Sequence, residues 1–248
     1  MVSVIIPTYQ RPEFLRRALR SLRAQQDAIW EAIVVEDGDG RGSSLARGFG
    51  DHRIRAYRNP GRGPNDARNA ALEVARGSVI AFLDDDDWWQ DPFHLHRICQ
   101  ELRHGEALVY RTGWLVTQIE GMELERVPFT LEATRHSLRR DNTLLASGVA
   151  YPTVMHDWLG SFDASLGHYW DWDWYLRVTD LGVPLRRIDE PGVCIAVHPG
   201  NASSTRHTET RRRDLERLCA KHGLQGIELK NHLHLGLEQP RAPELVSS

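Results

Sequence analysis

Four consecutive aspartates, Asp84 to Asp87, follow the apolar segment 78–83, which has the composition of a short buried strand. Carboxylates at the end of such a strand lie at the rim of a sheet, where open α/β folds bind their ligands. Carboxylate oxygens there suit Mg²⁺ or Mn²⁺, and these ions in turn hold phosphate oxygens. A solvated acidic turn is the alternative. The mutual repulsion of the four charges and the flanking aromatic residues favour a metal and nucleotide site.

Other polar clusters also follow predicted strands. They are Pro7-Thr8-Tyr9, Glu36-Asp37, and His198 with Asn201. Each cluster alone is a weak signal, because turns also favour Asp, Asn, Gly and Pro. Since the carboxyl ends of parallel strands share one edge of a sheet, we expect these clusters to converge with the four aspartates.

The elements that must position these residues alternate between strand and helix in the first half of the chain. Strands are predicted over residues 2–6, 30–35, 53–57, 78–83 and 107–116. Helices are predicted to begin at Pro12, Asp66 and Asp91. This alternation is typical of an α/β fold with a mainly parallel central sheet flanked by helices.

The second half of the chain has a less regular pattern. Its expected segments are, in order, a hairpin with a loop (118–142), a buried irregular stretch (144–154), a helix (169–181), a strand interrupted at Pro191-Gly192 (183–197) and a charged helix (208–221). The last ten residues are expected to fray.

The composition is that of an ordinary soluble protein. The 248 residues are 41% hydrophobic and 26% charged, and the net charge of −3 gives no argument for nucleic acid as a partner. Three cysteines lie far apart without metal-ligand spacing, as in a protein of a reducing compartment. With no signal sequence or long apolar span, we expect a cytoplasmic protein. Peripheral contact with a membrane surface stays open, and so does the oligomeric state.

Four motifs follow one another at suitable spacing: Ser3-Val4-Ile5-Ile6-Pro7-Thr8-Tyr9, Val34-Val35-Glu36-Asp37-Gly38, Ala67-Arg68-Asn69, and Phe82-Leu83-Asp84-Asp85-Asp86-Asp87. Together they resemble the nucleotide-binding half of family 2 glycosyltransferases, which are inverting enzymes of the GT-A fold. Gly160-Ser161-Phe162-Asp163 and Trp170-Asp171-Trp172-Asp173 resemble the acceptor half of that family. The resemblance covers roughly residues 2–205. It implies a nucleotide-sugar-binding half (1–117), an acceptor-binding half of the same domain (118–222) and a partly disordered C-terminal extension (223–248).

The resemblance also implies roles for the donor-binding residues. A nucleotide-sugar donor, with UDP favoured, would have its nucleoside held by Pro7, Thr8, Tyr9 and Asp37. Arg68 would lie near the base or the diphosphate, although an exposed helix residue is an equal alternative.

Within the acidic run, Asp84 and Asp86 match the family's Asp-x-Asp motif. Asp84 would face the ribose, and Asp86 would bind Mn²⁺ or Mg²⁺ between the two phosphates. Asp85 is grouped with the donor-binding residues, but Asp85 and Asp87 fall outside the motif and are expected to orient the turn or bind waters near the metal. His198 would complete the metal ligands, since imidazole suits Mn²⁺, unless it is a capping or exposed histidine.

Asp171 is the candidate general base, because it matches the Asp of the family's Glu-Asp pair. A carboxylate there would deprotonate the acceptor hydroxyl, while a metal ion stabilises the departing nucleoside diphosphate, so inversion follows without a general acid. Asp173 cannot share a helix face with Asp171, and the choice between them stays open. Without the resemblance, Asp171 would be interpreted as a helix cap or dipole partner. Trp170 departs from the pattern, since the family commonly has Glu at that position.

Other functions remain as alternatives. A nucleotidyltransferase of related fold usually carries a Gly-rich loop with Arg and Lys near its N-terminus, and residues 8–12 offer none. A non-catalytic nucleotide-sugar-binding protein would need no base. A glycoside hydrolase would explain paired acids but not the metal-like cluster. The acceptor, a carbohydrate or another hydroxyl-bearing molecule, is not specified by these motifs.

Overall fold

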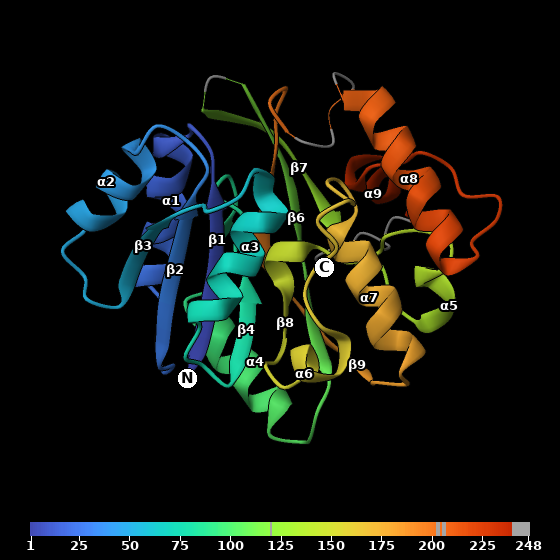
Figure 1. Cartoon of the computed structure of the whole chain (residues 1–248), viewed down its shortest axis with the longest axis horizontal. Coiled ribbons are helices and arrows are strands. Elements are labelled where there is room, and N and C mark those ends of the chain that lie inside the picture. Colours follow the sequence, from blue (N-terminus) through green and yellow to red (C-terminus); the bar gives the residue numbers. More distant parts are fainter. Residues whose placement is uncertain (120, 202–203, 205–206, 240–248) are drawn as a thin grey trace, which may run out of the picture.

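The computed structural model describes residues 1–119, 121–201, 204 and 207–239, and it has a twisted central sheet between helices (Figure 1). The first half alternates strands and helices as predicted. Its elements are β1 (Val2–Thr8), α1 (Pro12–Arg23), β2 (Trp30–Glu36), α2 (Arg41–Gly48), β3 (Ile54–Arg58), α3 (Gly63–Val74), β4 (Val79–Phe82), β5 (Trp88–Trp89) and α4 (His94–Leu102). Helix α2 was not predicted, because its Gly- and Ser-containing sequence carries no apolar period.

The second half contains the predicted hairpin, the two predicted helices and the interrupted strand. Its elements are β6 (Leu108–Ile119), β7 (Met122–Phe129), α5 (Arg135–Leu138), the 3₁₀ turn η1 (Ala146–Gly148), β8 (Val149–Pro152), α6 (Met155–Leu159), α7 (Trp170–Asp180), β9 (Leu185–Val197), α8 (Thr208–His222) and α9 (His232–Glu238). The three short helices α5, α6 and α9 were not predicted. Strand β9 is irregular near Pro191, since its partners jump from Arg111↔Ile188 to Gly113↔Val193. Of the terminal segment predicted to fray, residues 240–248 lie outside the described residues.

The sheet has the strand order β3-β2-β1-β4-β8-β6-β9-β5, with β7 paired to β6. Strands β3, β2, β1 and β4 are parallel, in keeping with the mainly parallel sheet that was predicted. Beyond β4 the sheet is mixed, because β8 runs antiparallel to β4 and β6, and β7 runs antiparallel to β6. The parallel part therefore presents the carboxyl ends of β1, β2 and β4 at one edge.

Both faces of the sheet are covered. On one face, Leu15 and Leu19 of α1 and Leu95 of α4 pack with Val4 and Ile6 of β1. On the other face, the side chains of α3, α7 and α8 pack with Ile5, Ile33 and Phe82, in keeping with the two-residue alternation of a strand. Figure 1 shows α2 and the first strands at one end of the molecule and α8 and α9 at the other.

Helix α9 packs against the long hairpin of β6 and β7. Its Leu235 lies in a small core with Leu115, Phe129 and Leu145. Of the segment after residue 222, which was predicted as a partly disordered extension, α9 is thus folded onto the β6–β7 hairpin.

Candidate active site

The carboxyl ends of β1, β4 and β9 meet at one edge of the sheet. Thr8 at the end of β1 donates from Oγ1 to Oδ2 of Asp85 at 2.7 Å. The backbone N–H of Ala196 in β9 donates to Oδ1 of Asp87 at 3.0 Å. Asp37 follows β2 and its N–H donates to the carbonyl oxygen of Thr8 at 2.9 Å. The polar clusters that were expected to converge lie together at this edge.

Asp86 is at the centre of these contacts. Its Oδ2 accepts a hydrogen bond from Nη1 of Arg11 at 2.5 Å, and it lies 3.2 Å from Nε2 of His198 and 3.4 Å from Nδ2 of Asn201. Burial alone would raise the pKa of Asp86, but the hydrogen bond with His198 and the charge of Arg11 bring the net pKa below its usual value. Asp86 is therefore an ionised carboxylate beside an imidazole.

Asp85 and Asp87 are turned into the protein. Burial raises the pKa of Asp85 to about 7, against the opposing charge of Arg11. Asp87 accepts a hydrogen bond from Oγ of Ser147 at 2.5 Å, and burial raises its pKa well above the ordinary value. With Thr8 and Ala196 as further partners, the two carboxylates hold the acidic turn in shape.

Arg68 of α3 connects the acidic turn to α7. Its Nη2 lies 2.7 Å from Oδ1 of Asp84, and its guanidinium lies 3.9 Å from the centre of the Trp170 ring. The Arg68 side chain is buried, so the exposed-helix alternative is wrong. Because Trp170 precedes Asp171 at the start of α7, one guanidinium contacts both the acidic turn and the beginning of the helix that carries the predicted base.

The residues predicted to hold the nucleoside lie at the ends of β1 and β2. Pro7 and Thr8 are buried within β1, while Tyr9 is 54% exposed. Asp37 accepts hydrogen bonds from the N–H of Gly63 at 2.6 Å and from Nδ2 of Asn59 at 3.0 Å. Gly63 has a φ of +82°, a conformation that glycine adopts without strain, and this aims its N–H at Asp37. The Asp37 carboxylate is therefore held in a fixed orientation at the carboxyl end of β2.

Asp171 lies in the first turn of α7 and is only 7% exposed. Its Oδ2 accepts a hydrogen bond from Nδ2 of Asn142 at 2.8 Å. Burial raises the pKa of Asp171, against the opposing charge of His232 and the hydrogen bond from Asn142. A carboxylate with a raised pKa and one orienting hydrogen bond is suited to accept a proton.

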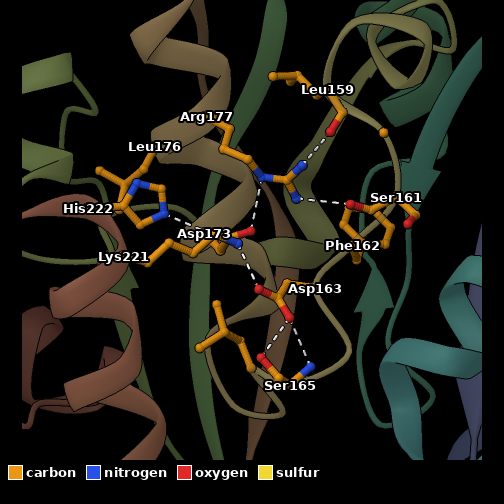
Figure 2. Close-up of polar contacts among 12 residues, drawn as sticks. Leu159, Ser161, Phe162, Asp163, Ser165, Asp173, Leu176, Arg177, Lys221 and His222 are labelled. Atoms are coloured by element: carbon orange, nitrogen blue, oxygen red, sulfur yellow. Dashed lines mark hydrogen bonds and ion pairs between the residues drawn. The ribbon is translucent and has the colours of Figure 1, made fainter.

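Asp173 is surrounded by basic side chains (Figure 2). Its Oδ1 lies 2.8 Å from Nζ of Lys221 and 2.7 Å from Nε2 of His222, and its Oδ2 accepts from Nε of Arg177 at 3.0 Å. Burial raises the pKa of Asp173, but these partners lower it overall. Asp173 is fully buried, so its carboxylate serves as a structural ion-pair centre between α7 and the end of α8.

The same network fixes the loop before α7. Arg177 donates from Nη1 to the carbonyl oxygen of Leu159 at 2.7 Å and from Nη2 to that of Ser161 at 3.1 Å, and Lys221 also lies 2.7 Å from Oδ2 of Asp163. Figure 2 shows these contacts radiating from Asp173 and Arg177. The first turn of α7, which carries Asp171, is thereby held by contacts with the loop before the helix and with the end of α8.

A divalent ion would find two side-chain ligands at this edge, Asp86 and His198. Among the described residues, no three His, Cys, Asp or Glu side chains gather into a ready-made metal cage. A carboxylate with an imidazole still fits an ion that takes its remaining ligands from water and substrate phosphates, which is the usual arrangement for Mg²⁺ and Mn²⁺ with nucleotides.

Sequence reasoning missed several residues of the site. Arg11 contacts Asp85 and Asp86, and Asn142 contacts Asp171, yet neither was singled out. Arg11 had a detectable signal, because an arginine directly after a strand-end motif and before a helix-starting proline must lie near that strand's end. Asn142 had none, since it comes from a loop 29 residues from its partner.

A hollow lined partly by apolar residues adjoins this edge. It has a volume of about 350 Å³ and is lined by Phe14, Gln118, Ile119, Gly121, His198 and Pro199. Beside it, three side chains of the β6–β7 hairpin are largely exposed: Ile119 (53%), Met122 (63%) and Leu124 (59%). We call these three the hairpin patch. Within the described residues, no helix has the length and apolar character that crossing a bilayer requires.

The chain is similar in sequence to known proteins. The family model described as Glycosyl transferase family 2 matches residues 3–155 of the chain. YwdF of Bacillus subtilis, named an uncharacterized glycosyltransferase, is 30% identical over 245 residues, which cover 96% of this chain and 90% of YwdF. WfgD of Escherichia coli, named a UDP-Glc:alpha-D-GlcNAc-diphosphoundecaprenol beta-1,3-glucosyltransferase, is 36% identical over 91 residues, or 36% of each chain.

Solved structures have the same fold. S. aureus TarS 1-349 in complex with UDP aligns with a TM-score of 0.66 at 20% sequence identity, over 92% of this chain and 67% of that chain. At this identity the likeness concerns the fold.

Proposed function

The chain belongs to glycosyl transferase family 2 and has the GT-A fold, and from this premise we propose that it moves a sugar from a UDP-sugar to an acceptor hydroxyl with inversion. The observation that carries the proposal is the bridge made by Arg68. It pairs with Asp84 on the donor side and stacks on Trp170 beside Asp171. A donor held over the acidic turn would present its sugar toward the start of α7.

The donor would bind along the edge formed by β1, β2 and β4. Asp37 would accept from the base, with Thr8 and Tyr9 beside the nucleoside, and Asp84 would face the ribose. UDP is supported by two similar proteins, since WfgD is named for UDP-Glc and a TarS structure contains UDP. The carboxylate of Asp37 is already held by Gly63 and Asn59, so it needs little reorganisation to receive a ligand.

Asp86 and His198 would hold a divalent ion, Mn²⁺ or Mg²⁺, against the diphosphate. When bound, such an ion neutralises charge on the leaving nucleoside diphosphate, so no proton donor is required. Asp86 is suited to this role because its pKa is lowered and it is ionised at neutral pH. Asp85 and Asp87 would keep the acidic turn in place through their buried hydrogen bonds with Thr8, Ser147 and Ala196.

Asp171 would act as the general base. It accepts the proton of the acceptor hydroxyl while that oxygen bonds to the anomeric carbon, and the bond from this carbon to the diphosphate oxygen breaks with its electrons going to the diphosphate. Asn142 orients the carboxylate through its 2.8 Å hydrogen bond. Asp173 is a poor candidate for this role, because Lys221, His222 and Arg177 already occupy both of its oxygens.

The acceptor would be carried on a membrane lipid. Support comes from the hairpin patch, whose exposed apolar side chains adjoin the hollow beside His198. WfgD, which is similar over part of its length, is named for a diphosphoundecaprenol-linked acceptor. The protein would then meet the membrane surface peripherally.

A thermal-shift panel tests the donor and the ion together. UDP, GDP and several UDP-sugars are added with and without Mn²⁺, and we expect UDP to stabilise the protein more strongly when Mn²⁺ is present. Stabilisation by UDP that is equal without Mn²⁺ would sink the metal assignment. The nucleotidyltransferase alternative predicts release of pyrophosphate from UTP and a sugar 1-phosphate, and we expect none.

A further inference from the structure

Arg11 contacts two adjacent carboxylates of the acidic turn. Its Nη1 donates to Oδ2 of Asp86 at 2.5 Å, and its Nη2 lies 2.8 Å from Oδ1 of Asp85. The Asp86 oxygen is the same one that faces Nε2 of His198 at 3.2 Å and Nδ2 of Asn201 at 3.4 Å. One carboxylate oxygen of Asp86 is therefore within hydrogen-bonding distance of an arginine, a histidine and an asparagine.

A divalent ion held by Asp86 and His198 would compete with Arg11, because Oδ2 is the Asp86 oxygen that faces both Arg11 and His198. Such an ion would bring two positive charges close to the guanidinium. Like charges at contact distance repel strongly in a site that is largely shielded from water. Occupation by the ion and the observed Arg11 contact therefore exclude each other.

Of the groups in this contact, Arg11 is the one able to move. Its side chain is 34% exposed, while those of Asp85 and Asp86 are 1% and 10% exposed. Asp85 is also held from the other side by Oγ1 of Thr8. Arg11 belongs to the short turn between β1 and α1, where the preceding Gln10 has the left-handed φ of +53° that folds the chain back over the acids.

A displaced guanidinium at this place has a suitable partner in the donor. Its planar fork matches the oxygens of a phosphate, and Arg makes such two-point contacts better than Lys. Such a displacement would involve only rotations of the Arg11 side chain, because Pro12 fixes the backbone at the start of α1.

We propose that Arg11 exchanges partners during donor binding, from Asp86 to the diphosphate of the donor as the divalent ion takes Asp86. The inference rests on the proposed function and adds a residue to it. Arg11 thereby keeps the acidic turn neutralised before the ion arrives, and afterwards holds the phosphate oxygens that the ion leaves free. It makes metal binding and diphosphate binding mutually supportive.

Arg11→Gln tests the exchange through binding, without a turnover assay. Mn²⁺ is titrated into the protein and followed by the electron paramagnetic resonance of free Mn²⁺, and we expect about tenfold tighter Mn²⁺ binding, because a competing charge is removed. In calorimetry at saturating Mn²⁺, UDP should bind about tenfold more weakly than to the wild type, whereas uridine, which has no phosphate, should bind equally to both.

Arg16→Gln is the matched control. Arg16 lies in α1, five residues further on, and pairs with Glu13 rather than with the acidic turn, so its loss changes the net charge alike but should leave both titrations unchanged. Arg11→Lys retains the charge without the two-point fork, and should keep the Mn²⁺ affinity near that of the wild type while still weakening UDP. It also supplies an independent variant if Arg11→Gln unfolds.

The outcomes separate this inference from the proposed function. Unchanged or weaker Mn²⁺ binding in Arg11→Gln, with Mn²⁺-dependent UDP binding intact in the wild type, overturns the exchange and leaves the function standing. Equal weakening of UDP and uridine also overturns it, because the loss then does not involve the diphosphate. If the wild type binds UDP without regard to Mn²⁺, the metal assignment and the exchange fail together.

Discussion

Asp171 and Asp173 are two residues apart in the first turn of α7, yet their carboxylates contact different elements and their pKa values are shifted in opposite directions. Asp171 accepts one hydrogen bond, from Asn142 in the loop after α5, and burial raises its pKa. The pKa of Asp173 is lowered overall by His222, Lys221 and Arg177, against the effect of burial. The same turn thus carries one carboxylate whose pKa is raised and one that is held by ion pairs, and the proposed roles of the two differ accordingly.

Asp171→Asn should abolish sugar transfer and spare donor binding. The amide cannot accept the proton of the acceptor hydroxyl, and we expect a loss of about 10²- to 10⁴-fold in kcat. UDP affinity, measured by calorimetry with Mn²⁺ present, should stay within twofold of the wild type because the role proposed for Asp171 is toward the acceptor and not the donor. A variant that keeps more than a tenth of the wild-type kcat would mean that another group is the base.

Asp173→Asn should damage stability rather than chemistry. Removing the charge leaves Lys221, His222 and Arg177 without their common anion, and breaking such a buried pair costs about 3 kcal/mol of unfolding free energy. Denaturant unfolding measures this directly. Asp157→Asn, which replaces an exposed aspartate of α6, is the control and should unfold like the wild type. A stable Asp173→Asn variant without activity would instead support Asp173 as the base.

The edge formed by the carboxyl ends of β1, β2 and β4 was accessible from sequence because its signals are local. An apolar run followed by acids marks a strand end, and parallel strands bring such ends together, so Thr8, Asp37 and Asp86 were predicted at one edge. The same logic could not choose between Asp171 and Asp173. Helix α7 is buried almost all round, and two of the partners of Asp173, Lys221 and His222, come from α8, nearly fifty residues away.

The second half of the chain was harder to predict for a related reason. Helix α9 joins the core through Leu235, but its short sequence has no strong apolar period of its own. Asn142 is a loop residue whose role depends wholly on where the chain places it. Arg11 is an intermediate case. Its sequence position predicts that it lies near the end of β1, but only the fold shows that it contacts Asp85 and Asp86.

Asp86→Ala should remove the metal dependence of donor binding. His198 alone is a weak ligand for Mn²⁺, so the extra thermal stabilisation that Mn²⁺ gives with UDP should disappear, while UDP alone should still stabilise the protein. Glu13→Ala removes an exposed acid of α1 that pairs with Arg16, and this control should keep the Mn²⁺ effect. Persistence of that effect in Asp86→Ala would place the ion elsewhere.

The hairpin patch should anchor the protein to lipid. Replacing Met122 and Leu124 together by Ser removes exposed apolar surface without touching the core, and we expect vesicle binding to weaken about tenfold. Co-sedimentation with phospholipid vesicles measures it. Leu181→Ser, which replaces an exposed leucine at the end of α7 away from the hairpin, is the control and should bind as the wild type does. Equal sedimentation of all three proteins would argue for a water-soluble acceptor.

Asp163 shares Lys221 with Asp173, and its ionised carboxylate should contribute to the free energy of unfolding. We expect this contribution to be lost in acid. Burial raises the pKa of Asp163, but hydrogen bonds from Lys221 and Ser165 outweigh it and bring the pKa down to about 2. Because the folded-state pKa is depressed, this contribution is fully present above the unfolded pKa near 4 and is lost as the pH falls through about 2. After allowance for solvent screening, we expect it to be about 1 kcal/mol.

Asp163→Asn removes that contribution and therefore flattens the acid side of the stability profile. Denaturant unfolding at pH 5, 4 and 3 should show the wild type losing more unfolding free energy than the variant over this interval, with the variant less stable at pH 5. Asp157→Asn should follow the wild-type profile, since that aspartate is exposed in α6. Parallel profiles for wild type and Asp163→Asn would show that the Lys221 contact does not hold Asp163 ionised, and that the loop before α7 is fixed by Arg177 instead.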